Sequence, residues 1–198
     1  QDVEVSALQV FRATINKRSP EIRVSVTHLL IKALGVAMAE LPTTNRIWVD
    51  DKILAFDQVD IGMVTETADG LRVPIIRDAG RRTLEEVAIE ARTLASRAQD
   101  DSLTQKEVGG GSVSISNVGM FGASSLIPII NAPQAIILGV GSEQALFRPD
   151  EAGHPVLHKE ICLTLACDHR VHDGADAARL LARLARILKN PSVSMQTG

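Results

Sequence analysis

The sequence has little that would suit the chain to bind nucleic acid or to enter a membrane. It contains no tyrosine and 3% aromatic residues, and its formal net charge is -3. Nucleic-acid binding needs a basic surface or stacking rings, so neither DNA nor RNA is expected as a partner. No apolar run approaches the ~20 residues that span a bilayer, and the chain does not open with a secretory leader. We therefore expect a soluble protein without a membrane partner.

Cysteine is also scarce. Cys162 and Cys167 are the only cysteines, and they lie five apart within one apolar run. On a strand, residues at this spacing face opposite sides, so neither a disulfide nor a shared metal ion is expected between them. This usage of cysteine suits a reducing compartment.

The length and composition that are present indicate one globular domain. The 198 residues are 45% apolar, which is enough for a single buried core. The chain opens on Gln1 rather than methionine and enters a strand-like segment directly, so we interpret it as part of a longer protein.

Alternation, helical periodicity and capping residues predict a mixed order of elements. In chain order we expect a strand at 2–5, a helix with Ser6 as N-cap, a buried helix at 27–41, hairpins at 46–56 and 59–77, a helix with a Thr83/Glu86 capping box, strands at 112–118, 135–141 and 157–167, and a helix at 175–189. Because no regular βαβ repeat is present, the prediction is an α/β fold of the α+β type, with a mixed, largely antiparallel sheet flanked by helices.

Three sequence features resemble functional sites but favour simpler interpretations. The glycine run at 109–111 leads into a strand and lacks a lysine, so it is interpreted as a flexible strand entry rather than a phosphate loop. Lys52 follows a turn, as lipoate-carrying lysines do, but a solvated turn lysine is the commoner case. The cluster of His169, His172 and Asp173 has no matching cluster elsewhere, so no metal is expected.

The stretch "LACDHRVHDGADAARLL" at 165–181 is the main candidate site. Its structural interpretation pairs Asp168 with Arg170, leaves His172 in solvent and makes Asp173 the N-cap of the last helix. Its functional interpretation makes His169 a general base, because a histidine directly after a buried strand is held rigidly. Histidine, with an ordinary pKa of ~6.5, is suited to accept a proton from a thiol or hydroxyl at neutral pH.

The stretch "SISNVGMFG" at 114–122 is the second candidate. Ser116 or Asn117 ends a strand there at a glycine-rich turn. Such a turn can present a donor to a developing oxyanion, although a plain polar strand end is the alternative.

These two stretches, together with "NAPQAIILGVG", "GLRVPIIRDA" and "LLARLARILKNP", resemble the catalytic domain of the dihydrolipoamide acyltransferases. These enzymes are the E2 components of 2-oxo acid dehydrogenase complexes, and the motifs occur in the same order over nearly the whole chain. The resemblance implies a chloramphenicol acetyltransferase-like fold. It also implies a homotrimer that assembles into a larger symmetric multienzyme core.

The resemblance assigns roles to three residues. It makes His169 the base, Ser116 the oxyanion donor and Asp173 the acidic residue of the "DHRxxDG" motif, with His169 of one subunit facing Ser116 of its neighbour. The implied reaction moves an acyl group, with acetyl favoured, from S-acyl-dihydrolipoyl to CoA without a metal. The implied location is the cytoplasm of a bacterium or the mitochondrial matrix of a eukaryote.

Within the family, residues 1–198 correspond to an acyltransferase catalytic domain that is incomplete at its N-terminus. An arginine that pairs with the acidic residue matched by Asp173 belongs to the segment before Gln1. The family's lipoyl and peripheral subunit-binding domains are also not in residues 1–198. The resemblance therefore implies that a domain outside this chain supplies the lipoyl group. It also implies that the E1 and E3 components bind through domains outside this chain.

Several alternatives stay open. Branched-chain acyl or succinyl transfer would use the same residues, and a non-catalytic core scaffold would use only the assembly surfaces. An antibiotic O-acetyltransferase on the same fold is a further alternative, although that family has a second histidine where this chain has Asp168.

Overall fold

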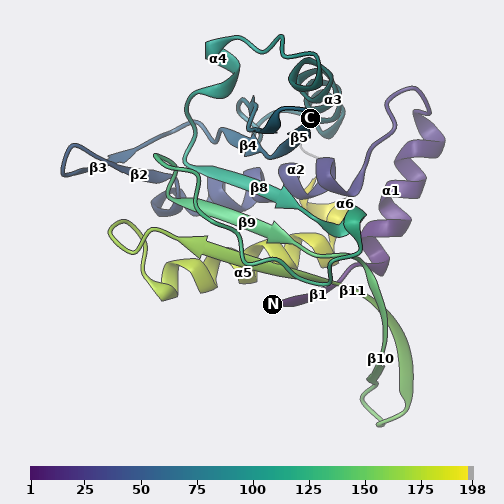
Figure 1. Ribbon diagram of the computed structural model, residues 1–198. Coiled ribbons are helices and arrows are strands. Elements are labelled where there is room, and N and C mark those ends of the chain that lie inside the picture. Colours follow the sequence, from purple (N-terminus) through teal and green to yellow (C-terminus); the bar gives the residue numbers. More distant parts are fainter. Residues whose placement is uncertain (196–198) are drawn as a thin grey trace.

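The computed structural model describes residues 1–195, and residues 196–198 lie outside the described part. Its strands are β1 (Asp2–Glu4), β4 (Ile61–Met63), β7 (Ile75–Ile76), β8 (Val113–Asn117), β9 (Ile136–Val140), β10 (Gln144–Pro149) and β11 (Pro155–Cys167), besides two hairpins described below. The main sheet has seven strands in the order β1-β11-β9-β8-β4-β7, with β10 paired to β11 (Figure 1). Strand β8 is parallel to β4 and β9, and the other pairs are antiparallel. The predicted mixed, largely antiparallel sheet is therefore confirmed.

The helices cover one face of this sheet. They are α1 (Ser6–Arg18), α2 (Val26–Glu40), α3 (Leu84–Gln99), α4 (Gln105–Val108), α5 (Gly174–Lys189) and α6 (Pro191–Ser194), with short 3-10 turns at η1 (Pro42–Thr44) and η2 (Gly119–Phe121). Helix α2 is buried nearly all round, as its apolar sequence predicts, because it packs against both α3 and α5. In residues 1–195 no helix is both long and apolar enough to cross a membrane.

The two predicted N-caps, Ser6 and Thr83, have different outcomes. Thr83 accepts a hydrogen bond from the Glu86 N–H and the Glu86 side chain accepts one from the Thr83 N–H, so the predicted capping box of α3 is confirmed. The prediction that Ser6 is the N-cap of the first helix is wrong. Ser6 is already helical, and its N–H, one of the four without a helical partner at a helix start, donates to the Glu4 carboxylate at 2.7 Å.

The first predicted hairpin is confirmed as β2 (Arg46–Val49) and β3 (Lys52–Ala55). The second is divided. Only β5 (Thr65–Thr67) and β6 (Gly70–Arg72) form a separate hairpin, whereas β4 and β7 join the main sheet. Pro74 lies directly before β7 and has no N–H for the ladder, which is consistent with a break at this point.

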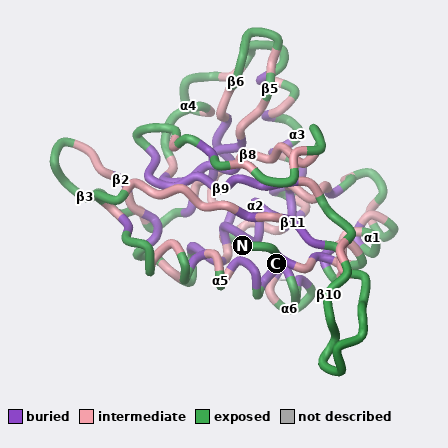
Figure 2. Tube along the Cα trace, turned by 60° about the horizontal axis from the view of Figure 1, so that its bottom comes forward, coloured by how far each residue is buried: buried purple, intermediate pink, exposed green. Residues whose placement is uncertain are grey.

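The strand β10 was missed by the sequence analysis. Together with the first part of β11 it forms an arm that stands away from the body and is exposed along most of its length (Figures 1 and 2). Its residues "QALFRP" neither alternate cleanly nor contact the core, so their sequence carries little strand signal.

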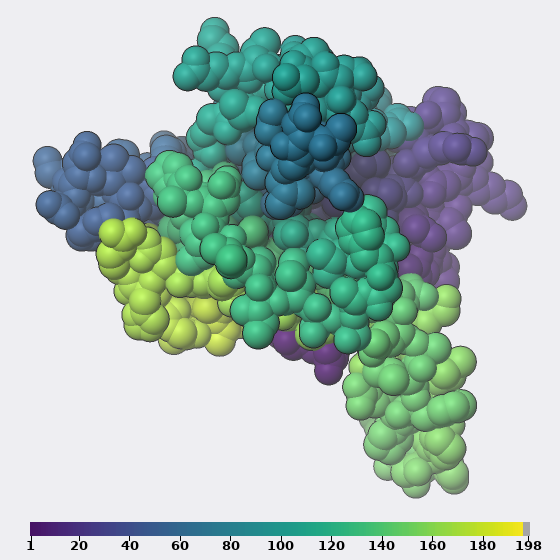
Figure 3. All heavy atoms as spheres, in the orientation of Figure 1, coloured from purple at the N-terminus to yellow at the C-terminus, as the bar shows by residue number. Residues whose placement is uncertain are grey.

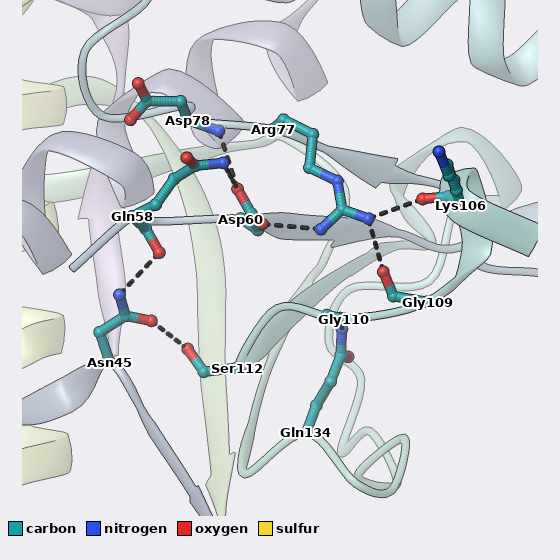
Figure 4. Close-up of polar contacts among 10 residues, drawn as sticks. All are labelled: Asn45, Gln58, Asp60, Arg77, Asp78, Lys106, Gly109, Gly110, Ser112 and Gln134. Atoms are coloured by element: carbon teal, nitrogen blue, oxygen red, sulfur yellow. Dashed lines mark hydrogen bonds and ion pairs between the residues drawn. The ribbon is translucent and has the colours of Figure 1, made fainter. Parts of the chain in front are cut away.

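The glycine run at 109–111 leads into β8, as predicted, and neighbouring side chains contact it (Figure 4). The Arg77 guanidinium donates to the Gly109 carbonyl at 2.6 Å and pairs with Asp60 at 2.7 Å. The Gln134 amide donates to the carbonyl of the next glycine at 3.1 Å. These contacts hold the entry to β8 against β4 and the start of β9.

Candidate active site

The loop 168–173 joins β11 to α5 and carries most of the candidate residues. The Asp168 N–H donates to the Ala135 carbonyl at 2.8 Å, which ties the end of β11 to the start of β9. The N–H groups of Val171 and His172 both donate to the Asp168 carbonyl at 3.0 Å. The loop is therefore a compact turn built on a buried sheet.

His169 and Asp173 lie at the two ends of this turn. His169 is exposed, so its ring is accessible from solvent. Asp173 is the N-cap of α5, and its carboxylate accepts a hydrogen bond from the Asp176 N–H at 2.8 Å. That bond, with smaller effects that include the nearby His169, lowers the pKa of Asp173 below its ordinary value. The capping role predicted for Asp173 is confirmed.

Arg170 holds the outer side of the loop. Its guanidinium makes two bonds to the Asp168 carboxylate, at 3.0 and 2.7 Å, and confirms the predicted pair. It also lies over the ring of Trp48, 5.6 Å from the ring centre. Figure 3 shows the loop beneath the β2–β3 hairpin that carries Trp48. The sequence analysis did not find Trp48, because nothing local signals a contact between residues so distant in the chain.

His172 contradicts the expectation that it is solvated. Its residue exposure is 2%, and within the described residues neither ring nitrogen has a hydrogen-bond partner. Burial is the main effect on this ring, and it lowers the pKa of His172 below the ordinary value. Of the two histidines in the loop, His169 is thus exposed and His172 is buried.

In residues 1–195 no three His, Cys, Asp or Glu side chains are grouped so that they could hold a metal ion.

Ser116 and Asn117 end β8. The Asn117 amide donates to the Thr27 hydroxyl at 3.0 Å, and its oxygen accepts from the Gly119 N–H at 2.9 Å. Asn117 therefore fixes the turn after β8 against the start of α2. Ser116, the other candidate donor, is half-buried on β8.

The structure brings His169 and Asp173 together but places Ser116 elsewhere. In the sheet, Ser116 is in register with Gly139, and Cys167 is in register with Ile136. With ~3.3 Å per residue and ~4.8 Å per strand, the Cα atoms of Cys167 and Ser116 are about 14 Å apart, and His169 lies beyond Cys167. Within one chain, His169 and Ser116 therefore stand on different parts of the sheet.

Two of the hollows on the surface differ in their relation to the candidate residues. One of about 660 Å³ adjoins the candidate loop; its lining consists of Trp48, Ile130, Ala132, Pro133, Gln134, Asp168 and Arg170. A larger one of about 1030 Å³ lies between α1, the start of α3 and α6. None of the predicted site residues lines the larger hollow, so its size alone does not make it the reactive centre.

Comparison with known proteins identifies the family. A family model described as the 2-oxoacid dehydrogenases acyltransferase (catalytic domain) matches residues 1–196. The chain belongs to this family. Solved structures of its members superpose closely: Azotobacter vinelandii dihydrolipoamide acetyltransferase has a TM-score of 0.91 at 29% identity, covering 98% of this chain and 81% of that one.

Curated relatives in this acyltransferase family are acetyltransferase components of pyruvate dehydrogenase complexes. That of Rickettsia prowazekii (strain Madrid E) is 35% identical over 195 residues, and the match covers 96% of this chain. The mitochondrial component of Schizosaccharomyces pombe is 40% identical over 184 residues, covering 91% of this chain. The matches cover 47% and 38% of those two proteins, so the chain spans about half their length or less.

The predicted fold type is confirmed by a more distant likeness. A chloramphenicol acetyltransferase superposes with a TM-score of 0.57 at 16% identity, covering 95% of this chain and 86% of that one. At this identity the likeness concerns the fold alone. The acyltransferase domain therefore has the architecture that its sequence motifs imply.

Proposed function

We propose that this domain transfers an acyl group, with acetyl favoured, from S-acyl-dihydrolipoyl to CoA. In this proposal, His169 is the general base, Ser116 is the oxyanion donor and Asp173 holds the loop of the base. The observation that carries it is the exposed imidazole on a rigid turn, with a strand-end hydroxyl at the opposite end of the same sheet. Relatives of known name support it, since they are dihydrolipoyllysine-residue acetyltransferases.

The spacing of the candidate residues gives further support. The Azotobacter vinelandii enzyme was solved to investigate a serine, a histidine and an asparagine in its catalytic mechanism, and its histidine and asparagine are four residues apart. His169 and Asp173 have the same spacing. By this spacing we match Asp173 to that asparagine, and both side chains are good N-caps, which fits a loop-holding role.

The chemistry proceeds through one tetrahedral intermediate. His169 takes the proton of the CoA thiol while the sulfur attacks the thioester carbonyl carbon and the carbonyl electrons move onto oxygen. Ser116 donates a hydrogen bond to this oxyanion. When the carbonyl re-forms, the bond to the dihydrolipoyl sulfur breaks, and this sulfur takes the proton from the imidazolium. General-base catalysis typically contributes ~10² to 10⁴-fold, and one oxyanion donor ~10² to 10³-fold.

A site of this kind needs more than one copy of the chain, and the surface fits such an assembly. The segment that follows Ser116 runs along the sheet face opposite the helices and exposes large apolar side chains; their exposures are 78% for Met120, 65% for Phe121, 85% for Ile127 and 90% for Ile129. Such a concentration of exposed apolar side chains is typical of a covered interface. This surface supports the proposed homotrimer, in which different subunits contribute His169 and Ser116.

Larger assembly and partners follow from the relatives. A structure described as the cubic core of the pyruvate dehydrogenase multienzyme complex superposes with a TM-score of 0.91 at 30% identity, which supports a symmetric core of trimers. Lipoyl domains and the E1 and E3 components would act through parts outside this chain. The relatives come from bacteria and mitochondria, so the proposed location is the bacterial cytoplasm or the mitochondrial matrix.

Thioester exchange between acetyl-CoA and dihydrolipoamide tests the reaction. His169→Ala is expected to lose ~10² to 10⁴-fold in kcat while keeping its oligomeric state, because an exposed imidazole contributes little to packing. His154→Ala, on the exposed arm, is the control and keeps full activity. If His169→Ala keeps full thioester-exchange activity, His169 is not the base. If the wild-type protein assembles fully but has no activity, the scaffold function is favoured.

The choice of acyl group has its own measurement. Initial rates with acetyl-, isobutyryl- and succinyl-CoA are expected to favour acetyl. A preference for isobutyryl or succinyl would keep the mechanism and move the domain to the branched-chain or succinyl type.

A further inference from the structure

The histidine at 172 has no part in the reaction, yet it lies in the loop that presents the base. It is three residues after His169 and one before the helix cap Asp173. Unlike His169, it is buried, with a residue exposure of 2%. A buried imidazole so close to an exposed catalytic one requires an explanation.

The surroundings of His172 favour the uncharged ring. The charged groups that act on it are Arg46 from β2, Asp176 from α5 and Asp168 at the end of β11. Burial has the largest effect on its pKa, and it outweighs the aspartates, so the pKa is lowered. The Arg46 backbone lies near enough to raise the pKa somewhat, but neither ring nitrogen completes a hydrogen bond in residues 1–195.

The ring is also connected to the position of the base. The His172 N–H and the Val171 N–H share the Asp168 carbonyl, so the backbone between 168 and 172 forms one compact turn around His169. If the His172 ring left its buried position, the backbone of this turn, including His169, would have to move with it. On the outer side, Arg170, bonded to Asp168 and stacked on Trp48, holds the loop.

We infer that His172 is a positioning residue for His169: its uncharged, buried ring locks the 168–173 loop, and protonation of this ring releases the loop and removes the base from its working position. The inference rests on the proposed role of His169. A charged imidazole in this place would be desolvated without a hydrogen-bonded partner, whereas in the opened loop it would be hydrated.

The direction of the pH effect follows from linkage. His172 in the opened or unfolded chain has the ordinary pKa of ~6.5, and in the closed loop its pKa is lower. Opening therefore takes up a proton at pH values between the lowered pKa and ~6.5. The loop is fully held above pH ~6.5 and is released progressively as the pH falls below that value.

Two variants separate this role from general packing. His172→Leu fills a similar volume, cannot be protonated and has no nitrogen to satisfy, so it is expected to be at least as stable as wild type at pH 8. His172→Gln is a polar, non-titrating alternative if the leucine variant fails to fold. His154→Gln, which removes an exposed imidazole on the arm, is the matched control.

The pH profile of kcat/KM between pH 8 and pH 5 is the first measurement. The wild-type and His154→Gln proteins are expected to lose activity as both His169 and His172 become protonated. The slope of log(kcat/KM) against pH should therefore steepen from about one toward about two as the pH falls. His172→Leu and His172→Gln are expected to keep activity at pH 8 and a slope of about one. Identical acid limbs in all four proteins would overturn the inference.

The second measurement does not depend on activity. In a His169→Ala background, the melting temperature is compared at pH 8 and pH 5.5 with and without His172→Leu. We expect acidification to lower the melting temperature more in the protein with His172 than in the protein with leucine at that position. An equal decrease in both proteins would also overturn the inference. Failure of the proposed function is seen separately, as full activity of His169→Ala at pH 8.

Discussion

His169 and Ser116 lie on either side of strand β9 and near its opposite ends. His169 follows the end of β11, and Ser116 lies near the end of β8. The row that holds Ser116 contains Gly139, whereas the row at the end of β11 contains Ile136 and Cys167. The parallel pairing of β8 with β9 and the antiparallel pairing of β9 with β11 fix this separation. We therefore expect a reaction that uses both side chains to be assembled from two chains.

The cap of helix α5 gives a first prediction. Asp173→Ala removes the acceptor for the Asp176 N–H and is expected to lower the melting temperature at pH 7 by about 2–4 °C. Asp173→Asn keeps the cap and is expected to stay near wild type. Because the pKa of Asp173 is lowered, the contribution of its charge is present at neutral pH and is lost as the pH falls through that lowered pKa.

Thermal unfolding of the three proteins at pH 7 and pH 3 checks this expectation. The gap between wild type and Asp173→Ala should be wider at pH 7 than at pH 3. A destabilised Asp173→Asn with an unaffected Asp173→Ala would show that the carboxylate does something other than cap.

The outer clamp of the loop gives a second prediction. Arg170→Lys keeps the charge but loses the two-pronged contact with Asp168 and the planar stacking on Trp48. Because small displacements of a catalytic group are costly, kcat/KM is expected to fall by ~10-fold. The melting temperature should change little, since the Arg170 side chain is 63% exposed.

The matched control for this clamp is Arg18→Lys. Arg18 is also exposed and also pairs with a carboxylate, that of Glu85, but it is the last residue of α1 and has no contact with the loop 168–173. Steady-state kinetics should separate the two variants. Equal rates for both would mean that Arg170 does not position His169.

A close approach of backbone behind Ser116 gives a third prediction. A Cβ on Gly141 would overlap the carbonyl oxygen of Ser124, so Gly141→Ala must displace the segment that follows β8. We expect a loss of about 1–3 kcal/mol in the free energy of unfolding, together with lower activity. Gly174→Ala meets no heavy atom within 4 Å and is expected to stay within about 0.5 kcal/mol of wild type.

Chemical denaturation of both alanine variants provides the measurement. Equal stability of Gly141→Ala and Gly174→Ala would show that the segment 118–135 shifts freely and does not fix the end of β8.

The parts of the fold that the sequence predicted are those governed by local rules. The capping box of Thr83 and Glu86 starts α3 at the predicted place, and the run that ends at Cys167 forms a strand followed by α5. Ser6 shows the limit of such rules, because it lies inside the helix and its own N–H bonds to Glu4. The helix begins there without a capping side chain.

The parts that the sequence could not predict depend on contacts between distant segments. His172 was expected in solvent but is buried, and charged groups that act on it, Arg46 and Asp176, come from the distant β2 and from α5. The stacking of Arg170 on Trp48 joins residues more than a hundred positions apart and has no local signal. The separation of His169 from Ser116 likewise follows from strand order, which single residues do not encode.

Subunit complementation tests the central claim most directly. His169→Ala and Ser116→Ala are each expected to be nearly inactive alone, and are then unfolded together, refolded as mixed trimers and assayed by thioester exchange. If the two groups come from different subunits, each mixed trimer regains one intact site, and a one-to-one mixture should recover about a quarter of wild-type activity. If mixing restores nothing although mixed trimers form, His169 and Ser116 do not act across an interface and the account is wrong.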